Sequence, residues 1–174
     1  MSIEIQRAVD RPPVPWKNGL GVQYEITCDG SLPDEWTWRL STADITQDVP
    51  FSVFPGVNRE FCVADGNGVV LNINGVEHRC EPGSITKFRG DDEVFATLID
   101  GPMRALNLMV RDGAAQKHLY RNFSALALAV VAIGDVQILQ FAEVDYRLDV
   151  LDAIIGWDGN VSEDHDWKHS IFLA

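Results

Sequence analysis

The sequence predicts an all-β protein, either a sandwich or a barrel, on three observations. Short runs of residues alternate between apolar and polar types along most of the chain, and turn signals separate them at intervals of roughly 8–12 residues. No segment combines helical periodicity with capping residues at its ends. Of the 174 residues, 46% are apolar and 23% are charged, which is typical of a globular domain with a sizeable core.

Seven strands are predicted in the first part of the chain. The strongest hairpin signal is Asn74-Gly75, because both residue types tolerate the positive φ angles of a two-residue turn. Pro82-Gly83 marks the next turn, and the charged segment 89–92 separates two further strands. In chain order the predicted strands are 22–28, 36–43, 69–73, 76–80, 85–88, 94–99 and 105–111.

The first two of these strands form a predicted hairpin around Leu32. In that register Glu25 lies opposite Arg39 and supplies the guanidinium with a carboxylate. Alternation along the second strand gives it one apolar face and one face with a guanidinium and hydroxyls. The apolar face consists of Trp36, Trp38 and Leu40, and the polar face of Thr37, Arg39 and Ser41.

The polar stretch 112–116 divides the chain, and the residues beyond it show only a generic β pattern. Gly134-Asp135 marks a tight turn in this second part. We interpret the chain as a single domain, 1–174, with a main half at 1–113 and a shorter second half at 114–174. The predicted strands of the second half are 126–133, 136–141, 146–150, 153–157 and 170–173.

Charge and composition exclude several classes of partner. Lys and Arg total 14 against 26 Asp and Glu, and the net charge of −12 repels nucleic acid and anionic membrane surfaces. No apolar run approaches the ~20 residues that cross a bilayer, and the first residues lack the features of a signal peptide. We therefore expect a cytoplasmic protein, with its three scattered cysteines reduced: Cys28, Cys62 and Cys80.

Arg39 and Arg59 lie in segments rich in large aromatic residues, within a chain that has few cations. A guanidinium in such surroundings needs an anion, because an unpaired charge removed from water is strongly destabilising. The anion is either a carboxylate of the protein or a bound ligand, and the residues alone favour neither.

Four blocks of the chain occur in the order found in a known family. They are 15–21 with Glu25-Ile26, 38–41 with Ala43, 50–56 with Arg59, and 106–111. Through these blocks the chain resembles the HutD/Ves family over residues 15–111. Two positions depart from the family pattern, because Leu20 replaces the middle glycine of the first block and Gln23 stands where threonine is usual.

The resemblance implies a cupin (RmlC-like) fold with two β-barrel halves, which here would be bicupin-like with a shorter second half. It also implies an association with bacterial histidine-utilisation operons or with stress responses. For the histidine-linked members, the implied role is to hold down induction of the pathway, and N-formylglutamate is a suggested ligand.

The usual cupin metal site takes His-x-His, a following Glu and a second His. With Gly66 as the fixed glycine of that pattern, the ligand places fall on Ser52, Phe54 and Arg59, and a second motif puts Glu93 in the last place. Because a guanidinium repels a cation, no metal and no other cofactor are expected. None of the four histidines falls in a ligand place: His78, His118, His165 and His169.

A fixed positive charge at Arg59 would instead make an anion receptor for a small carboxylate. The predicted partner is a small anionic metabolite, and no residue is assigned a catalytic role, since Ser52 has no visible base partner. The predicted ligand-binding residues are Lys17, Asn18, Glu25, Arg39, Ser41, Ser52, Phe54, Arg59 and Asn107.

Two other interpretations stay open. A metal-independent cupin enzyme acting on a small carboxylate would need Glu25 or Glu93 as its titratable base. A structural or interaction subunit would depend on exposed apolar strands, through which a homodimer would form.

Overall fold

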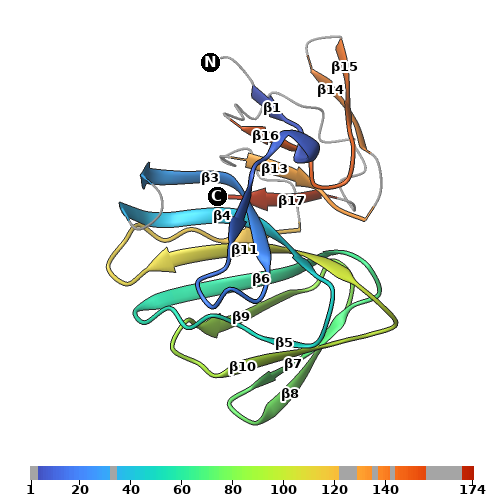
Figure 1. Cartoon of the computed structure of the whole chain (residues 1–174). Helices are drawn as coiled ribbons and strands as arrows, with labels where there is room; N and C mark the ends of the chain where they lie inside the picture. Colours follow the sequence, from blue (N-terminus) through green and yellow to red (C-terminus); the bar gives the residue numbers. More distant parts are fainter. Residues whose placement is uncertain (1–3, 32–34, 122–128, 135–136, 142–143, 156–169) are drawn as a thin grey trace. The chain divides into compact units, whose positions relative to one another are not determined.

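A computed structural model describes residues 4–31, 35–121, 129–134, 137–141, 144–155 and 170–174. In these ranges the regular structure is entirely β-strand, apart from one 3₁₀ turn at Ala8–Asp10 (Figure 1). None of the described residues belongs to an apolar helix of membrane-spanning length. The chain divides into two compact units, residues 12–116 and residues 1–11 with 117–174.

The first unit, residues 12–116, is a sandwich of two antiparallel sheets (Figure 1). Buried residues of both sheets form one apolar cluster, which includes Phe61, Leu71 and Ala96. The larger sheet has the strand order β2 (Pro13–Pro15), β3 (Val22–Ser31), β4 (Glu35–Ile45), β11 (Met103–Arg111), β6 (Val57–Asp65), β9 (Ile85–Arg89). The smaller sheet has the order β5 (Val49–Pro50), β10 (Val94–Leu98), β7 (Val69–Ile73), β8 (Val76–Cys80).

The seven strands predicted for this unit are confirmed, with ends displaced by at most three residues. Asn74 and Gly75 have φ angles of 51° and 86°, as a two-residue turn with positive φ at both positions requires. Strand β6 (Val57–Asp65) is not predicted from the sequence. Most of its nine residues are buried, and Arg59 and Glu60 interrupt the apolar run, so its residue types do not alternate.

Two bulges in the β3–β4 hairpin make the predicted register wrong. The Cα partner of Glu25 is Ser41 and the partner of Arg39 is Cys28, so Glu25 does not lie opposite Arg39. The register shifts between these two pairs and shifts again beyond Cys28. A bulge adds a residue to one strand only, and alternation of residue types does not reveal it.

Asp29 holds the second bulge in place. Its Oδ1 accepts hydrogen bonds from the backbone N–H groups of Thr37 (2.7 Å) and Trp38 (2.8 Å), and its Oδ2 accepts one from the Thr37 hydroxyl. The bulge turns Trp36 to the same face of the strand as Arg39. The Arg39 guanidinium lies 4.9 Å from the centroid of the Trp36 ring. The predicted face shared by Trp36, Trp38 and Leu40 is therefore wrong at Trp36.

The second unit, residues 1–11 and 117–174, contains a five-stranded antiparallel sheet and a separate hairpin. Strand β1 (Glu4–Gln6) pairs with β16, so the first residues group with this unit, whereas the sequence division at 113 grouped them with the main half. The sheet continues with β16 (Ala153–Ile155), β13 (Ala129–Ala132), β17 (Ser170–Leu173) and β12 (Leu119–Tyr120). The hairpin consists of β14 (Gln137–Phe141) and β15 (Val144–Leu148).

A buried carboxylate, that of Asp152, fixes the turn that follows β1. It accepts hydrogen bonds from the Arg7 guanidinium at 2.6 Å and from the Ala8 N–H at 2.7 Å.

Each of the five strands predicted for the second half has a counterpart among the described residues. None of the three cysteines forms a disulfide.

Candidate ligand-binding cavity

A cavity of about 520 Å³ lies on the inner face of the six-stranded sheet, within the first unit. The strand register arranges the residues of this face in rows that run across neighbouring strands. The first row is Cys28, Arg39, Met109, Arg59 and Phe88. The second row is Glu25, Ser41, Asn107, Phe61 and Thr86. The third row is Val14, Gln23, Ala43, Ala105 and Val63.

Arg59 is a buried cation among aromatic rings in the first row. Its exposed fraction is 7%. The centre of its guanidinium lies 4.9 Å from the ring centroid of Phe88, 5.2 Å from that of Phe51 and 5.9 Å from that of Phe54. Faces of aromatic rings attract a cation, but they replace only part of the hydration that a buried charge loses.

The hydrogen bonds of Arg59 go to neutral groups. Its Nη1 donates to the Ser52 carbonyl and its Nη2 donates to Asn107 Oδ1, each at a distance of 3.4 Å. The buried Nε has no hydrogen-bond partner. In the described part of the chain no carboxylate forms an ion pair with this guanidinium. Burial and the charge of Arg39 lower the pKa of Arg59 to about 9, so the group is still charged at neutral pH.

Arg39 is the second buried cation of the first row, on the other side of Met109 from Arg59. Its Nε and Nη2 each lie 3.3 Å from the Met109 sulfur, a weak acceptor. Its guanidinium also lies 5.3 Å from the Phe54 ring centroid. Both arginines therefore face one aromatic ring from neighbouring positions on the sheet.

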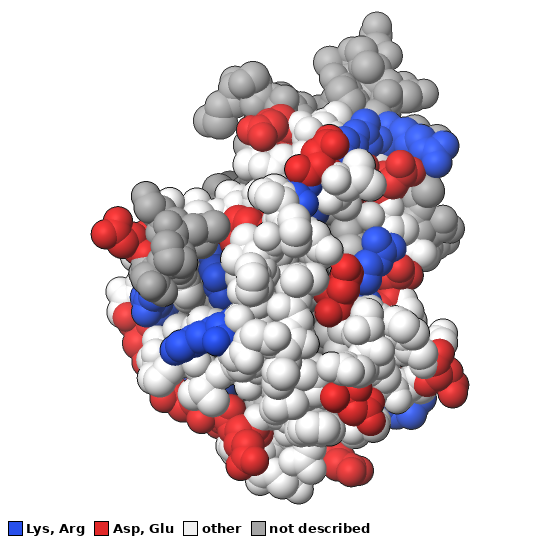
Figure 2. Space-filling view, viewed as in Figure 1, with Lys and Arg blue, Asp and Glu red and all other residues white. Residues whose placement is uncertain are grey.

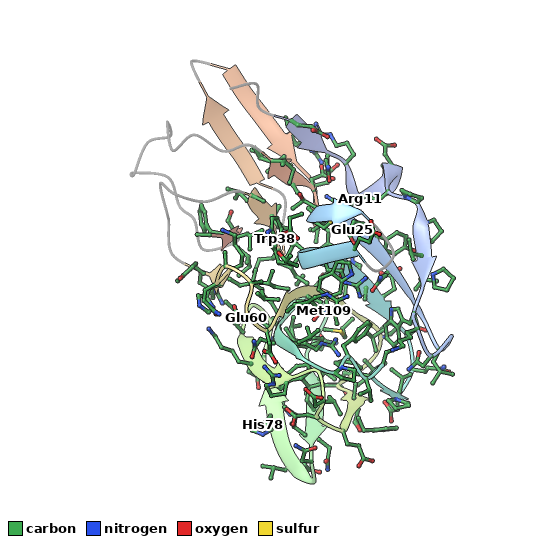
Figure 3. All side chains as sticks on the ribbon, turned by 90° about the vertical axis from the view of Figure 1, so that its left-hand side faces the viewer. Arg11, Glu25, Trp38, Glu60, His78 and Met109 are labelled. Carbon is green, nitrogen blue, oxygen red and sulfur yellow. The ribbon has the colours of Figure 1, made fainter. Side chains whose placement is uncertain are left out.

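Glu25, labelled in Figure 3, shares the second row with Ser41 but is not a wall of the cavity. Both of its carboxylate oxygens are buried and have no hydrogen-bond partner of ordinary geometry. Burial raises the pKa of the Glu25 carboxyl to about 7, an effect that the Arg39 charge and the Cys28 thiol oppose. At neutral pH the carboxyl is therefore only partly ionised.

Lys17 and Phe54 lie in loops at the charged end of the cavity, which is the end where Arg39 and Arg59 lie. The Lys17 Nζ lies 5.6 Å from the Phe54 centroid, so three cations surround this one ring. The Phe54 N–H donates to the Gly90 carbonyl at 2.8 Å. A Cβ on Gly90 would lie 2.1 Å from the Phe54 carbonyl oxygen, so only glycine permits this approach.

Asn18 joins the loop 16–21 to β5 and to Ser52, which follows it. Its N–H donates to the Ser52 hydroxyl at 3.2 Å, and its side-chain amide donates to the Pro50 carbonyl at 3.1 Å. Leu20, which replaces a family glycine, does not have a positive φ angle, so a side chain is tolerated at this position. Asn18 therefore shapes the rim of the cavity without lining it.

The structure brings six of the nine predicted ligand-binding residues to the cavity wall and leaves three beside it. Asn18, Glu25 and Ser41 are the three that do not line it. The six wall residues are Lys17, Arg39, Ser52, Phe54, Arg59 and Asn107.

Several wall residues were not assigned from the sequence. Every second residue of a strand shares a face, so alternation from Arg39 and Asn107 would have identified Ala43 on β4 and Ala105 on β11. Gln23, the other departure from the family pattern, also lines the cavity. Its position depends on the register of β3, which the bulges set and alternation of residue types does not reveal.

The donor set of this cavity does not fit the metal of other cupins. Among the described residues its walls carry no imidazole, thiol or carboxylate, and three of its side chains are cations. Glu93, placed last in the metal pattern, is exposed and its N–H donates to Asn74 at 2.9 Å, so that placement is wrong. The residue paired with Arg59 on β9 is Phe88.

Nowhere in the described ranges do three or more His, Cys, Asp or Glu side chains converge as a metal site would require. His78 lies on β8 and is exposed (Figure 3). His165 and His169, interpreted as a solvated pair, lie outside the described residues.

The fold and the cavity define a cupin-type β-sandwich protein with a cationic pocket. The HutD family model matches residues 8–166, and the chain belongs to this family. The predicted HutD/Ves resemblance is therefore confirmed.

Two relatives match over part of their length. The chain is 39% identical over 109 residues to an uncharacterized 21.2 kDa protein in the hutC 3′ region of Pseudomonas putida. The matched region covers 62% of this chain and 57% of that protein. It is 38% identical over 98 residues to the protein Ves of Citrobacter koseri, covering 55% of this chain and 51% of Ves. The chain thus spans about half the length of these relatives.

Two solved structures at about 30% identity each cover 99% of the chain. One is a conserved protein of unknown function from Pseudomonas aeruginosa PAO1, with a TM-score of 0.74, 29% identity and 91% of that chain covered. The other is HutD from Pseudomonas fluorescens SBW25 in a formate condition, with a TM-score of 0.69, 30% identity and 94% of that chain covered. The predicted fold class, all-β and cupin-type, is confirmed by these matches.

Proposed function

We propose that this chain is a metal-free receptor for a small organic carboxylate and that it regulates histidine utilisation rather than catalysing a reaction. The observation that carries the proposal is Arg59, a buried guanidinium at the cavity wall with no anionic partner in the described residues. A carboxylate in the cavity would supply charge-assisted hydrogen bonds, each contributing about 1.5–3 kcal/mol.

The electrostatics of the charged end support an anionic ligand. Acidic side chains spread over the lower part of Figure 2, where β7 to β10 lie in Figure 1, so the cations of the cavity are a local exception in a chain of net charge −12. Arg39 and Arg59 flank Met109, and together they offer a carboxylate donors from two sides. A ligand with a free ammonium group is disfavoured, because the described walls hold no acid to pair with it.

The family supports a connection with histidine utilisation. One relative stands in the hutC 3′ region of Pseudomonas putida, and a solved structure of similar fold is HutD in a formate condition. N-formylglutamate carries two carboxylates and a neutral formamide in place of an ammonium. It is therefore the first compound to test.

The chemistry of the cavity gives little support to an enzyme. General acid–base catalysis needs a titratable group within hydrogen-bond reach of the substrate. Glu25 is not a cavity wall and Glu93 is exposed, so neither of the candidate bases reaches a ligand in the cavity. The Ser52 hydroxyl accepts a hydrogen bond from Asn18, and the described walls hold no histidine that would activate it.

Isothermal titration calorimetry with N-formyl-L-glutamate and with its neutral diamide tests the proposal. The wild-type chain should bind the acid and not the diamide, and Arg59→Met should weaken binding of the acid at least about tenfold. Arg79→Met, which changes an exposed arginine on β8, is the matched control and should leave the affinity unchanged. Equal binding of acid and diamide would contradict the receptor, and turnover of the acid detected by NMR would establish an enzyme.

A further inference from the structure

The inner face of the six-stranded sheet forms the floor of the cavity, and its side chains change from cationic to uncharged along the strands. The first row holds the two arginines, and the second row offers the Asn107 amide. The third row carries no charge, since it consists of Val14, Gln23, Ala43, Ala105 and Val63. From Arg39 to Ala43 the strand advances four residues, about 13 Å at ~3.3 Å per residue. One end of the floor is thus cationic, and the other end, about 13 Å away, is neutral.

The neutral end has room for an apolar group. Ala43 and Ala105 are direct register partners on adjacent strands, and their methyl groups leave space above the sheet. Most of the surrounding wall residues are apolar, and Gln23 is a neutral polar one. The apolar ones are Val14, Pro15, Trp16, Ile45 and Phe61. A volume of about 520 Å³ lies in the range of cavities that hold ligands much larger than formate or acetate.

We propose that the ligand is amphipathic: its carboxylate binds between Arg39 and Arg59, and an uncharged apolar group extends over Ala43 and Ala105. This inference rests on the proposed function and names the ligand class. A short diacid keeps both carboxylates near the arginines. A long diacid would place its second carboxylate over the third row, where no cation compensates for the lost hydration.

The test is a titration of the wild-type chain with butanoate, hexanoate, octanoate and octanedioate. Affinity should rise about fourfold for each methylene added, as expected when apolar surface enters an apolar site. Octanedioate should bind at least tenfold more weakly than octanoate. Arg59→Met should abolish binding of every acid, which separates cavity binding from non-specific adsorption of long chains.

Ala43→Phe fills the neutral end and should remove the dependence of affinity on chain length. Val76→Phe, which adds the same ring to exposed strand β8, is the matched control and should keep the full dependence. If Ala43→Phe lacks a cooperative urea transition, the wild-type series alone decides the outcome.

The outcomes separate this inference from the receptor proposal. Wild-type affinity that does not change with chain length, or octanedioate that binds as tightly as octanoate, overturns the apolar subsite while the receptor stands. A folded Ala43→Phe variant that keeps the chain-length dependence also overturns the subsite. If none of the acids binds, both the subsite and the carboxylate receptor are overturned.

Discussion

Arg59→Met is expected to stabilise the ligand-free protein. The guanidinium is buried against three phenyl rings, its Nε has no partner, and its two hydrogen bonds are long and neutral. Methionine is unbranched, about two atoms shorter and uncharged, and its sulfur packs well against aromatic rings. The substitution should therefore remove a burial penalty at little cost in packing.

The magnitude follows from the pKa of Arg59, which burial and the Arg39 charge lower by between three and four pH units, to about 9. At 1.36 kcal/mol for each pH unit, this difference corresponds to about 5 kcal/mol of destabilisation of the charged form. For a base with a lowered pKa, the unfolded state binds more protons between pH 9 and the ordinary pKa of arginine, so the penalty is present in full below pH 9. Because the replacement loses some contacts, we expect a net gain of about 2–4 kcal/mol.

Urea denaturation at pH 7, followed by tryptophan fluorescence, measures the free energy of unfolding of both proteins. A gain of this size would raise the Tm by roughly 5–15 °C for a chain of this length. The control Arg79→Met should change the free energy of unfolding by less than about 0.5 kcal/mol, because that side chain is exposed. Loss of more than about 1 kcal/mol in Arg59→Met would refute the reasoning, since it would mean that the guanidinium has a stabilising partner inside the protein.

Three further predictions concern the surroundings of the cavity. Burial raises the pKa of Glu25 to about 7, so between pH 4.5 and 7 the native state binds a proton that the unfolded state releases. The free energy of unfolding of the wild-type chain should therefore fall by up to about 3 kcal/mol as the pH rises through this range. Glu25→Gln should remove that dependence in urea titrations at pH 5, 6, 7 and 8, whereas exposed Glu77→Gln should keep it. Gly90→Ala should displace Phe54 and weaken carboxylate binding in calorimetry, and unchanged binding would contradict the role given to that contact. Asp29→Ala should cost about 1–3 kcal/mol in urea denaturation through the two backbone N–H groups left unpaired in the bulge, and a neutral result would show that Asp29 does not hold it.

Much of the first unit could be predicted from local sequence. The hairpin at Asn74-Gly75 depends on positive φ angles that neighbouring residues do not alter, and it occurs where it was predicted. Arg39 and Arg59 stood out because a cation in an aromatic segment needs an anion. Only the family resemblance favoured a bound ligand over a protein carboxylate as that anion, and both arginines line the cavity. Strand β6 was missed because both of its faces are buried, which removes the alternation that marks a half-buried strand.

The register of β3 and β4 could not be obtained in the same way. The bulge at Asp29 depends on hydrogen bonds between residues eight and nine positions apart, so neither strand reveals it alone. The wrong register put Glu25 opposite Arg39 and gave the arginine a partner within the hairpin. In the structure Glu25 lies opposite Ser41 and has no hydrogen-bond partner of ordinary geometry.

The sequence by itself determined the β class, most of the strands, the turns and the presence of two unusual arginines, because these depend on residue type and on spacing within a few positions. Only the tertiary structure decided which residues share a row. Pairing between distant strands places Arg39, Met109 and Arg59 side by side, and Ala43 beside Ala105 two rows away. These neighbours are up to about 70 positions apart in the chain, and their contact is fixed by strand register and by burial against the second sheet.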